Sequence, residues 1–272
     1  MVKAKKLKRW TGFDTAVTVL AILAVAVTLY PMVYVVSASI SDPISVMAGN
    51  VVLFPVGFSL DAYRIVVANM DFWRSMLNSV LYVVVGCVLM FLTTVLVAYP
   101  LTRPNLKFRK ILTYYLLIPM YFSGGMIPAF LVVSNLGLYD SPLALILPGC
   151  YSIWNIILCR TFMASLPTEM IDSALIDGSD QFRTLLKIVL PLSKPVIAVI
   201  MIYTIVGVWN SWFNASIYTT REEIQPVQLY LRHVLSAASS SLQSRFLEQL
   251  PPEVRQGYQQ MAVSANQIKY AM

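Results

Sequence analysis

The sequence predicts an all-α protein that crosses a membrane several times, and both its composition and its uncharged runs support this prediction. Of its 272 residues, 58% are hydrophobic and only 12% are charged, with a mean hydropathy of +0.69. A soluble domain carries about 25% charged residues. Because backbone polar groups cannot be left unpaired in lipid, the spans of such a chain are expected to be helices.

Five long segments contain no Asp, Glu, Lys, Arg or His. Each can supply the roughly 20 residues that are needed to cross about 30 Å of hydrocarbon. We therefore expect five spans, within Thr15–Ser41, Ser75–Thr102, Ile111–Tyr139, Ser141–Cys159 and Pro195–Thr220.

Most basic residues lie on one side of these spans, either before the first, between the second and third, or between the fourth and fifth. Short loops rich in Lys and Arg stay in the cytoplasm. Residues 1–14 are therefore predicted to form a basic cytoplasmic N-terminus, residues 15–220 a membrane domain and residues 221–272 an external segment. Topology accounts for the formal charge of +7, so the lipid bilayer is the expected partner and nucleic acid is not.

The polar stretch of residues 165–191, called the loop 165–191 below, is predicted to form two helices on the cytoplasmic side. Ser165 is a suitable cap for the first helix, and Pro167 suits its opening turn. Gly178 can adopt the left-handed conformation that ends a helix, and Ser179 or Asp180 can cap the next one.

The second of these helices is expected to be amphipathic and to stop at Pro191. Its apolar side is predicted to contain Phe182, Leu185, Leu186 and Val189. Such a hairpin suits the docking of a protein at the membrane face. The alternative is a hairpin that lies on the lipid headgroups without a partner.

Polar, aromatic and flexible residues within the spans are candidates for lining a solute pathway: Asn78, Gly124, Gly125, Asn155, Trp209, Asn210 and Asn214. Aromatic faces stack on sugar rings, and amides hydrogen-bond to sugar hydroxyls. On one helix Trp209 and Trp212 would share a face. The structural alternatives stay open, namely interhelical hydrogen bonds for the amides, an aromatic belt for the tryptophans, and kinks or close packing for the glycines.

A membrane-embedded enzyme is disfavoured, because the five runs hold no acidic residue and the only histidine, His233, is predicted to be external. The three cysteines lack the spacing of a metal site or a disulfide framework. We therefore expect no catalytic or metal-binding residue. The sequence also has no Gly-x4-Gly-Lys-Ser/Thr phosphate loop, so ATP hydrolysis would need another chain.

The spacing within the loop 165–191 is similar to the EAA motif of ABC importer permeases. That pattern is Glu-Ala-Ala, three residues, Gly, nine residues and Ile-x-Leu-Pro. This chain has Asp172-Ser173-Ala174, Gly178 and Ile188-Val189-Leu190-Pro191 at the same spacing, with departures at Asp172 and Ser173. Residues 15–236 resemble the carbohydrate-type permeases of the LplC- and YtcP-like group, relatives of the maltose permease subunit MalG, for example at Phe122–Pro128 and Leu190–Pro195.

This resemblance implies a type I ABC importer permease fold in the plasma membrane of a bacterium. The implied partners are a cytoplasmic ATPase dimer that holds ATP and Mg, a second permease subunit and an external solute-binding lipoprotein; this chain itself would bind no cofactor. The implied coupling residues are Glu169, Asp172, Ser173, Ala174, Asp177, Gly178, Ile188, Leu190 and Pro191. The implied solute is a sugar or oligosaccharide, with an amino acid, phosphate or polyamine as the alternative.

Permeases of this group have six spans, whereas the uncharged runs here supply five. Residues 261–272 resemble the lead-in to a sixth span. A fragment of a longer protein is therefore the expectation for this sequence.

Overall fold

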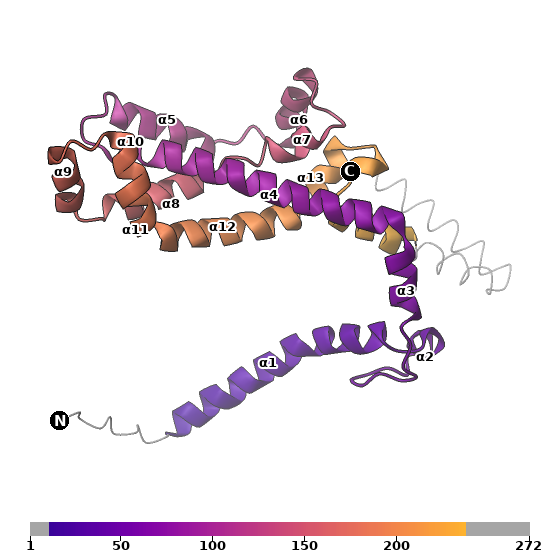
Figure 1. The fold of residues 1–272 in the computed structure, drawn as a ribbon. Helices are drawn as coiled ribbons and strands as arrows, with labels where there is room; N and C mark the ends of the chain where they lie inside the picture. The colour runs from indigo at the N-terminus through magenta and orange to yellow at the C-terminus, as the bar shows by residue number, and fades with distance from the viewer. Residues whose placement is uncertain (1–10, 238–272) are drawn as a thin grey trace. The chain divides into compact units, whose positions relative to one another are not determined.

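The computed structural model describes residues 11–237, and within them it contains helices joined by turns and short loops (Figure 1). The only β-type pairing in this range is an isolated bridge between Ser41 and Phe58. The chain divides into two compact units, Met1–Met70 and Asp71–Met272. The predicted all-α class is confirmed.

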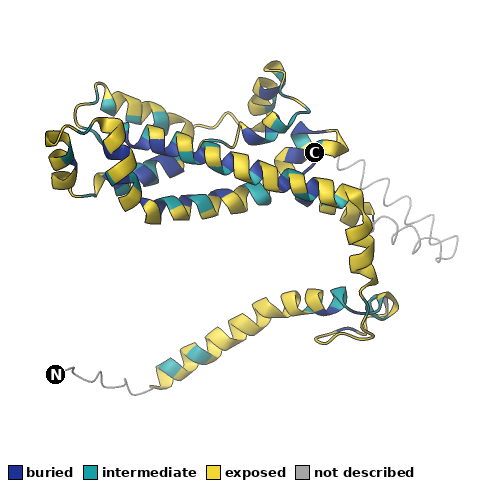
Figure 2. Ribbon diagram, in the orientation of Figure 1, coloured by how far each residue is buried: buried dark blue, intermediate teal, exposed yellow. Residues whose placement is uncertain are grey.

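The first unit contains α1, which spans Gly12–Ser39 and covers most of the first predicted span. A capping box starts this helix, because the Thr11 side chain accepts from the Asp14 N–H while Asp14 accepts from the Thr11 N–H. Figure 2 shows exposed residues all round most of α1. A helix that is apolar and exposed on every side is suited to lipid.

Two short helices and a loop follow α1 in the same unit. Asp42 caps α2 (Pro43–Met47) by accepting from the Ser45 N–H at 3.1 Å. The hydroxyl of Ser37 donates to the carbonyl of Leu53 at 2.6 Å, which ties the end of α1 to the loop before α3. Helix α3 spans Asp61–Ala68, and the Ser59 hydroxyl just before it accepts from the Asp61 N–H at 3.1 Å.

Helix α4 (Met70–Ala98) belongs to the second unit except for its first residue, and it is followed by a short 3₁₀ helix, η1 (Pro100–Thr102). These residues match the second predicted span. One face of α4 is buried in this unit, as the dark blue positions in Figure 2 show. Small and polar side chains recur on that face, at Ser75, Ser79, Gly86 and Thr94, and small residues allow helices in membranes to approach closely.

The third predicted span is not one straight helix. Helix α5 covers Arg109–Tyr121 and α6 covers Met126–Asn135, with a bend of 113° between them. The break contains Gly124 and Gly125, and Gly125 has a φ of +82°, which the glycine backbone adopts readily.

The fourth and fifth predicted spans are also interrupted. Pro148 and Gly149 separate α7 (Pro142–Ile146) from the 12-residue α8 (Ile153–Ala164). The remaining helices are α9 (Thr168–Ile176), α10 (Gln181–Thr184), η2 (Leu185–Val189), α11 (Leu190–Leu192), α12 (Lys194–Trp209), α13 (Trp212–Tyr218) and η3 (Glu222–Ile224). Within residues 11–237, two helices are long and apolar enough to cross a membrane alone, or up to four spans exist if each bent pair is one.

The main core of the second unit joins α4, α8 and α12, which run alongside one another in Figure 1. Its fully buried side chains include Cys159, Met163, Val189 and Ile200. A smaller cluster of Val133, Ala144 and Tyr218 joins α6, α7 and α13.

Residues 221–237 are the described part of the predicted external segment, and hydrogen bonds tie their beginning to α4. The Ser79 hydroxyl accepts from the Val227 N–H at 2.8 Å, and the Tyr82 hydroxyl donates to the Ile224 carbonyl at 2.7 Å. Residues 227–237 are helical. The predicted lead-in to a sixth span, residues 261–272, lies outside the described residues.

Replacing Ser79 by Ala should lower the free energy of unfolding by about 1–3 kcal/mol, because the buried Val227 N–H loses its acceptor. Unfolding in detergent micelles and hydrogen exchange at the Val227 amide would measure the loss. The matched control is Ser216→Ala, since Ser216 is exposed and donates only within its own helix. Equal stability of the two variants would contradict this role of Ser79.

Candidate functional site

The loop 165–191 connects α8 to α12, and the structure corrects its predicted beginning. Ser165 ends α8 instead of starting α9, because its hydroxyl donates backwards to the Phe162 carbonyl at 2.7 Å. Helix α9 starts after Pro167 without a side-chain cap. Pro167 fixes the entry to this helix, as a proline next to the first turn commonly does.

The turn at Gly178 agrees with the sequence prediction. Gly178 has a φ of +80°, and the Ser179 N–H donates to the Ala174 carbonyl at 2.9 Å. This bond satisfies a carbonyl that α9 leaves open at its end. Asp180 then caps α10 by accepting from the Arg183 N–H at 2.6 Å. The local sequence therefore fixes the angle between the two helices.

Three apolar side chains anchor the loop to the membrane helices. Ile171 and Leu185 are each 3% exposed and Val189 is fully buried, all within the core that α4, α8 and α12 share. The Tyr99 hydroxyl at the end of α4 adds a polar link by donating to the Gln181 side chain at 2.9 Å. The loop thus belongs to the same buried core as α4, α8 and α12.

The predicted apolar side of the second helix is only half correct. Leu185 and Val189 are buried as expected, but Phe182 is 60% exposed and Leu186 is 47% exposed. Other apolar side chains of the loop are also exposed, with Ile176 at 85%. The loop therefore presents an apolar surface away from its own core.

Acidic side chains accompany this exposed surface. Glu169, Asp172 and Asp177 are all exposed, and they lie on or next to α9. Of the other predicted coupling residues, Ser173 is exposed and donates to the Glu169 carbonyl, while Ala174, Ile188 and Leu190 are half-buried. The loop thus combines carboxylates with exposed apolar side chains on a surface that its own unit leaves uncovered.

Pro191 does not stop the helix, contrary to the prediction. The turn before it widens into the π-helix η2, in which the Leu190 N–H donates to the Leu185 carbonyl. A wider turn can accommodate the proline ring, which would clash with the carbonyl four residues earlier in an α-helix. The helix ends one residue later, at Leu192, and the axis bends by 78° at Ser193 before α12 begins.

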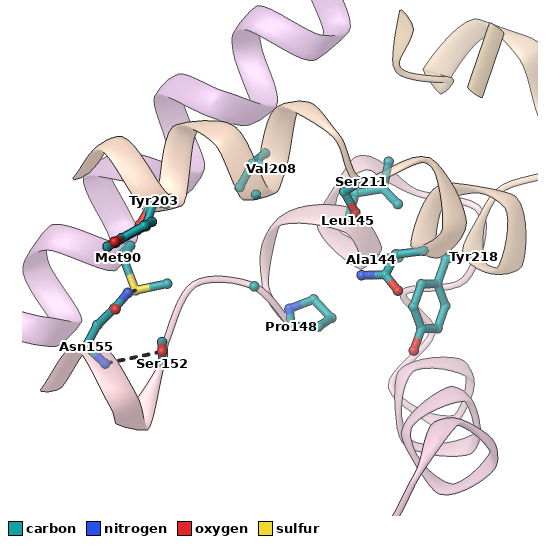
Figure 3. A pocket seen from close by; sticks show the side chains of 14 residues that line it. Met90, Ala144, Leu145, Pro148, Ser152, Asn155, Tyr203, Val208, Ser211 and Tyr218 are labelled. Atoms are coloured by element: carbon teal, nitrogen blue, oxygen red, sulfur yellow. Dashed lines mark hydrogen bonds between the residues drawn. The ribbon is translucent and has the colours of Figure 1, made fainter. Parts of the chain in front are cut away.

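A second feature is a cavity of about 410 Å³ between α4, α7, α8, α12 and α13, called the α8–α12 cavity below. Figure 3 shows Asn155, Met90 and Tyr203 at one end of it and Tyr218 at the other. The Asn155 side-chain N–H points to the Met90 sulfur at 3.7 Å, and its backbone N–H donates to the Ser152 hydroxyl. Among the described residues that line this cavity, none is Asp, Glu, Lys, Arg or His.

The predicted pathway residues do not all come together. Asn155 and Asn214 line the α8–α12 cavity, whereas Asn78 donates to the carbonyls of Glu223 and Gln225 in the loop after α13. Neither Gly124 nor Gly125 is among the lining residues; both lie at the exposed break between α5 and α6.

The expected shared face of the two tryptophans is wrong. Helix α12 ends at Trp209 and α13 begins at Trp212, with a break at Asn210 and Ser211. The Asn210 side chain donates back to the Val206 carbonyl, so it closes the end of α12. Trp212 instead stacks under the Arg232 guanidinium at 3.6 Å. A polar break of this kind interrupts the helical period on which the prediction depended.

One wall of the cavity, which α12 forms, was not predicted from the sequence. Five of its lining residues, three or four positions apart or adjacent, form one face of α12 and its end: Tyr203, Thr204, Gly207, Val208 and Ser211. This spacing is the signal that could have identified the face. Gly207 contributes space, since a Cβ atom added there would meet nothing within 4 Å.

Tyr218 is held in the cavity wall by a clasp at Asp140. The Asp140 N–H donates to the Tyr218 carbonyl at 2.9 Å, and its carboxylate accepts from the N–H groups of Thr220 and Arg221. The Arg221 guanidinium adds an ion pair at 3.1 Å. The two backbone N–H groups lower the pKa of Asp140 below its ordinary value of 3.8, with a smaller contribution from the Arg221 charge.

We expect Asp140→Asn to reduce hydrogen-exchange protection of the Thr220 and Arg221 amides, because a neutral amide is a weaker acceptor than a carboxylate. Since the folded-state pKa is lowered, the clasp of the unaltered protein should hold above pH 3.8 and weaken as the pH falls below it. Exchange measured between pH 5 and pH 3, corrected for intrinsic rates, tests this.

The control is Asp61→Asn, which removes an exposed ion pair within α3. If Asp140→Asn leaves the protection of the two amides unchanged, the Asp140 carboxylate does not hold them.

Comparison with known proteins agrees with this architecture. The family described as binding-protein-dependent transport system inner membrane component matches residues 90–220. Protein LplC of Bacillus subtilis (strain 168) is 38% identical over 230 residues, which are 84% of this chain and 78% of LplC. The polygalacturonan/rhamnogalacturonan transport system permease protein YtcP of the same organism is 36% identical over 227 residues, which are 84% of this chain and 79% of YtcP.

A solved structure, that of a bacterial ABC transporter involved in the import of the acidic polysaccharide alginate, matches with a TM-score of 0.80. The identity is 33%, and the match covers 84% of this chain and 82% of that one. Proteins of this kind are transport permeases of the plasma membrane that work with an ATPase and a solute-binding protein, and they are not themselves enzymes. The predicted resemblance is confirmed, and the chain belongs to the inner membrane permease components of binding-protein-dependent ABC importers.

Proposed function

We propose that the loop 165–191 docks on a cytoplasmic ATPase dimer and transmits its movement to the membrane helices, and that the solute imported in this way is a saccharide. The main support for this proposal is that one side of the loop is buried in the core of the second unit while the other side is exposed. Ile171, Leu185 and Val189 are buried against α4, α8 and α12, while the rest of the loop exposes carboxylates and apolar side chains.

The buried anchors explain how movement would be transmitted. Close-packed side chains transmit displacement because their contacts are not easily compressed. A displacement of α9 by a bound partner therefore moves the ends of the helices that contact Ile171 and Leu185. The bend at Ser193 and the wide turn before it supply the place where α12 changes its tilt.

The exposed surface indicates the chemistry of the docking partner. Carboxylates at Glu169, Asp172 and Asp177 favour a groove with basic side chains, and the exposed Ile176 and Phe182 favour apolar walls in the same groove. Asp172 occupies the position at which the family pattern has Glu. Its side chain is one methylene shorter, and the neighbouring carboxylates can share the contact with a basic residue.

ATP and Mg belong, in this proposal, to the ATPase subunits, and this chain binds no cofactor. The basic residues of the loop and of the N-terminus support a cytoplasmic position for both. A second permease subunit completes the membrane path as a heterodimer, and an external solute-binding lipoprotein delivers the solute.

A saccharide is supported by the chemistry of the α8–α12 cavity and by the relatives. The cavity offers amides, hydroxyls and two tyrosine rings. Among the relatives, YtcP is named for polygalacturonan and rhamnogalacturonan, and the permease NgcG of Streptomyces coelicolor, 26% identical over 197 residues, is named for diacetylchitobiose.

The docking proposal predicts that Gly178→Trp abolishes ATP-driven uptake in proteoliposomes that hold the assembled importer. A Cβ at Gly178 meets nothing within 4 Å in this chain, so bulk there acts on the partner surface, together with the cost of the positive φ. Asp172→Lys should weaken docking by about 1.4 kcal/mol or more through charge reversal, and uptake that follows the docked fraction should then fall about tenfold or more. Both variants should still insert and fold.

The controls separate docking from backbone strain and from net charge. Gly178→Asn keeps a residue that tolerates positive φ and should retain most uptake. Asp61→Lys alters an exposed carboxylate in α3 and should leave uptake unchanged. Normal transport by the Gly178→Trp importer would show that the coupling assignment is wrong.

A further inference from the structure

The α8–α12 cavity has a lining that suits one class of saccharide. Its polar groups are amides and hydroxyls, and among the described lining residues none carries a full charge at neutral pH. A carboxylate that leaves water needs a cation or several N–H donors to offset the loss of hydration. Hydroxyl groups of a sugar need only neutral donors and acceptors, which this lining supplies.

Asn155 is a buried side chain of this cavity that can hydrogen-bond to a ligand. It is 8% exposed, and among the described residues the partner of its side-chain N–H is the Met90 sulfur at 3.7 Å. A thioether is a weak acceptor. A buried amide with such a poor partner retains hydrogen-bonding capacity, and in Figure 3 it lies at the same end of the cavity as Met90 and Tyr203.

The remaining walls supply what a pyranose ring requires. Tyr203 is 66% exposed, so its ring is accessible to a ligand for stacking. Ser211 and Asn214 stand beyond Gly207, where the absent side chain leaves room. Apolar side chains such as Met90, Leu145 and Val208 complete the lining, and polar groups placed among apolar walls fix the orientation of a small molecule.

We infer that this chain itself holds a binding site for a neutral saccharide unit in the α8–α12 cavity, and that the site disfavours uronic acids. The inference rests on the proposed import of a saccharide and narrows its class. It separates this chain from the relative and the solved importer named above for polygalacturonan and for alginate, which are acidic. It also excludes phosphate-bearing solutes from this site by the same electrostatic argument.

The test uses the full chain in lipid nanodiscs, with saturation-transfer NMR as the measurement of binding. The probes are the neutral trisaccharides maltotriose, cellotriose and raffinose, and trigalacturonate as the acidic one. We expect saturation transfer to at least one neutral probe and none to trigalacturonate. Transfer to trigalacturonate that equals or exceeds transfer to all the neutral probes would overturn the inference, as would the absence of transfer to every neutral probe.

Matched variants locate the site. Asn214→Ala and Tyr203→Ala should each weaken binding of the neutral probe about fivefold, the loss typical of one hydrogen bond or one stacking contact. The controls Asn210→Ala and Tyr114→Ala remove an exposed amide and a tyrosine of 65% exposure that do not line the cavity. Equal effects of the variants and their controls would show that the sugar binds elsewhere.

A variant that gains binding of an acidic sugar provides the most direct test. Asn214→Arg places a guanidinium at the cavity, where it can pair with a carboxylate in bidentate geometry. This variant should bind trigalacturonate, whereas Asn210→Arg should not. If Asn214→Arg does not bind trigalacturonate, the cavity is not the site that excludes acidic sugars.

The assembled importer separates this inference from the proposed function. ATP-driven uptake of trigalacturonate that Asn214→Ala leaves unchanged would overturn the cavity inference while the coupling role of the loop 165–191 stands. Normal uptake by the Gly178→Trp importer, with Asn214→Ala still reducing uptake of the neutral probe, would overturn the coupling role of the loop while the cavity inference stands.

Discussion

The packing of Ile171, Leu185 and Val189 against α4, α8 and α12 is the interaction on which the functional arrangement depends. Full burial of one such side chain from water contributes about 1.5–3 kcal/mol. The three together outweigh the modest contributions of the caps at Gly178 and Asp180. Without them the loop 165–191 would be a polar connection between helices. With them it is part of the core of the second unit, while its acidic and apolar surface remains exposed.

Breaks in the helices shape the rest of this unit. Pro148 and Gly149 end the helical path between α7 and α8, and Asn210 and Ser211 do the same between α12 and α13. Pro148, Gly149 and Ser211 line the α8–α12 cavity, so interrupted backbone and cavity coincide. Irregular backbone at membrane depth is tolerated where it is buried in protein or lines a cavity. The interruptions therefore create the space and supply polar groups around it.

Much of this fold could be predicted from composition, because uncharged runs of sufficient length must be helices in lipid. The interruptions were harder, since Pro and Gly occur in membrane helices both as tolerated kinks and as true breaks. Gly125 and Pro148 belong to breaks, whereas Pro31 lies inside the continuous α1. Tertiary packing decides whether a Pro or Gly kinks a helix or breaks it, and this packing cannot be predicted from the local sequence.

In the candidate site, too, the features that depend on local sequence could be predicted, and those that depend on tertiary packing could not. Gly178 and Asp180 behave as predicted because their roles depend on a turn of four or five residues. Phe182 and Leu186 do not, because helical periodicity locates an apolar face without specifying which part of it the other helices cover. The wall formed by Tyr203, Thr204 and Gly207 follows helical spacing, yet an apolar helix has several such faces. Only the position of Asn155 on α8 and Met90 on α4 selects this one.

Helix α12 connects the two features of the second unit. It begins at the bend beside the loop 165–191, and it carries the cavity face from Tyr203 onward. The distance between Ser193 and Tyr203 along the helix is about 15 Å at 1.5 Å per residue. Asn155, which also lines this cavity, hydrogen-bonds to α4 only through the weak acceptor Met90 among the described residues. If the loop 165–191 couples the ATPase to the membrane helices as proposed, a tilt of α12 about Ser193 would carry Tyr203 and Gly207 with it, so that displacement of the loop would change the shape of the cavity.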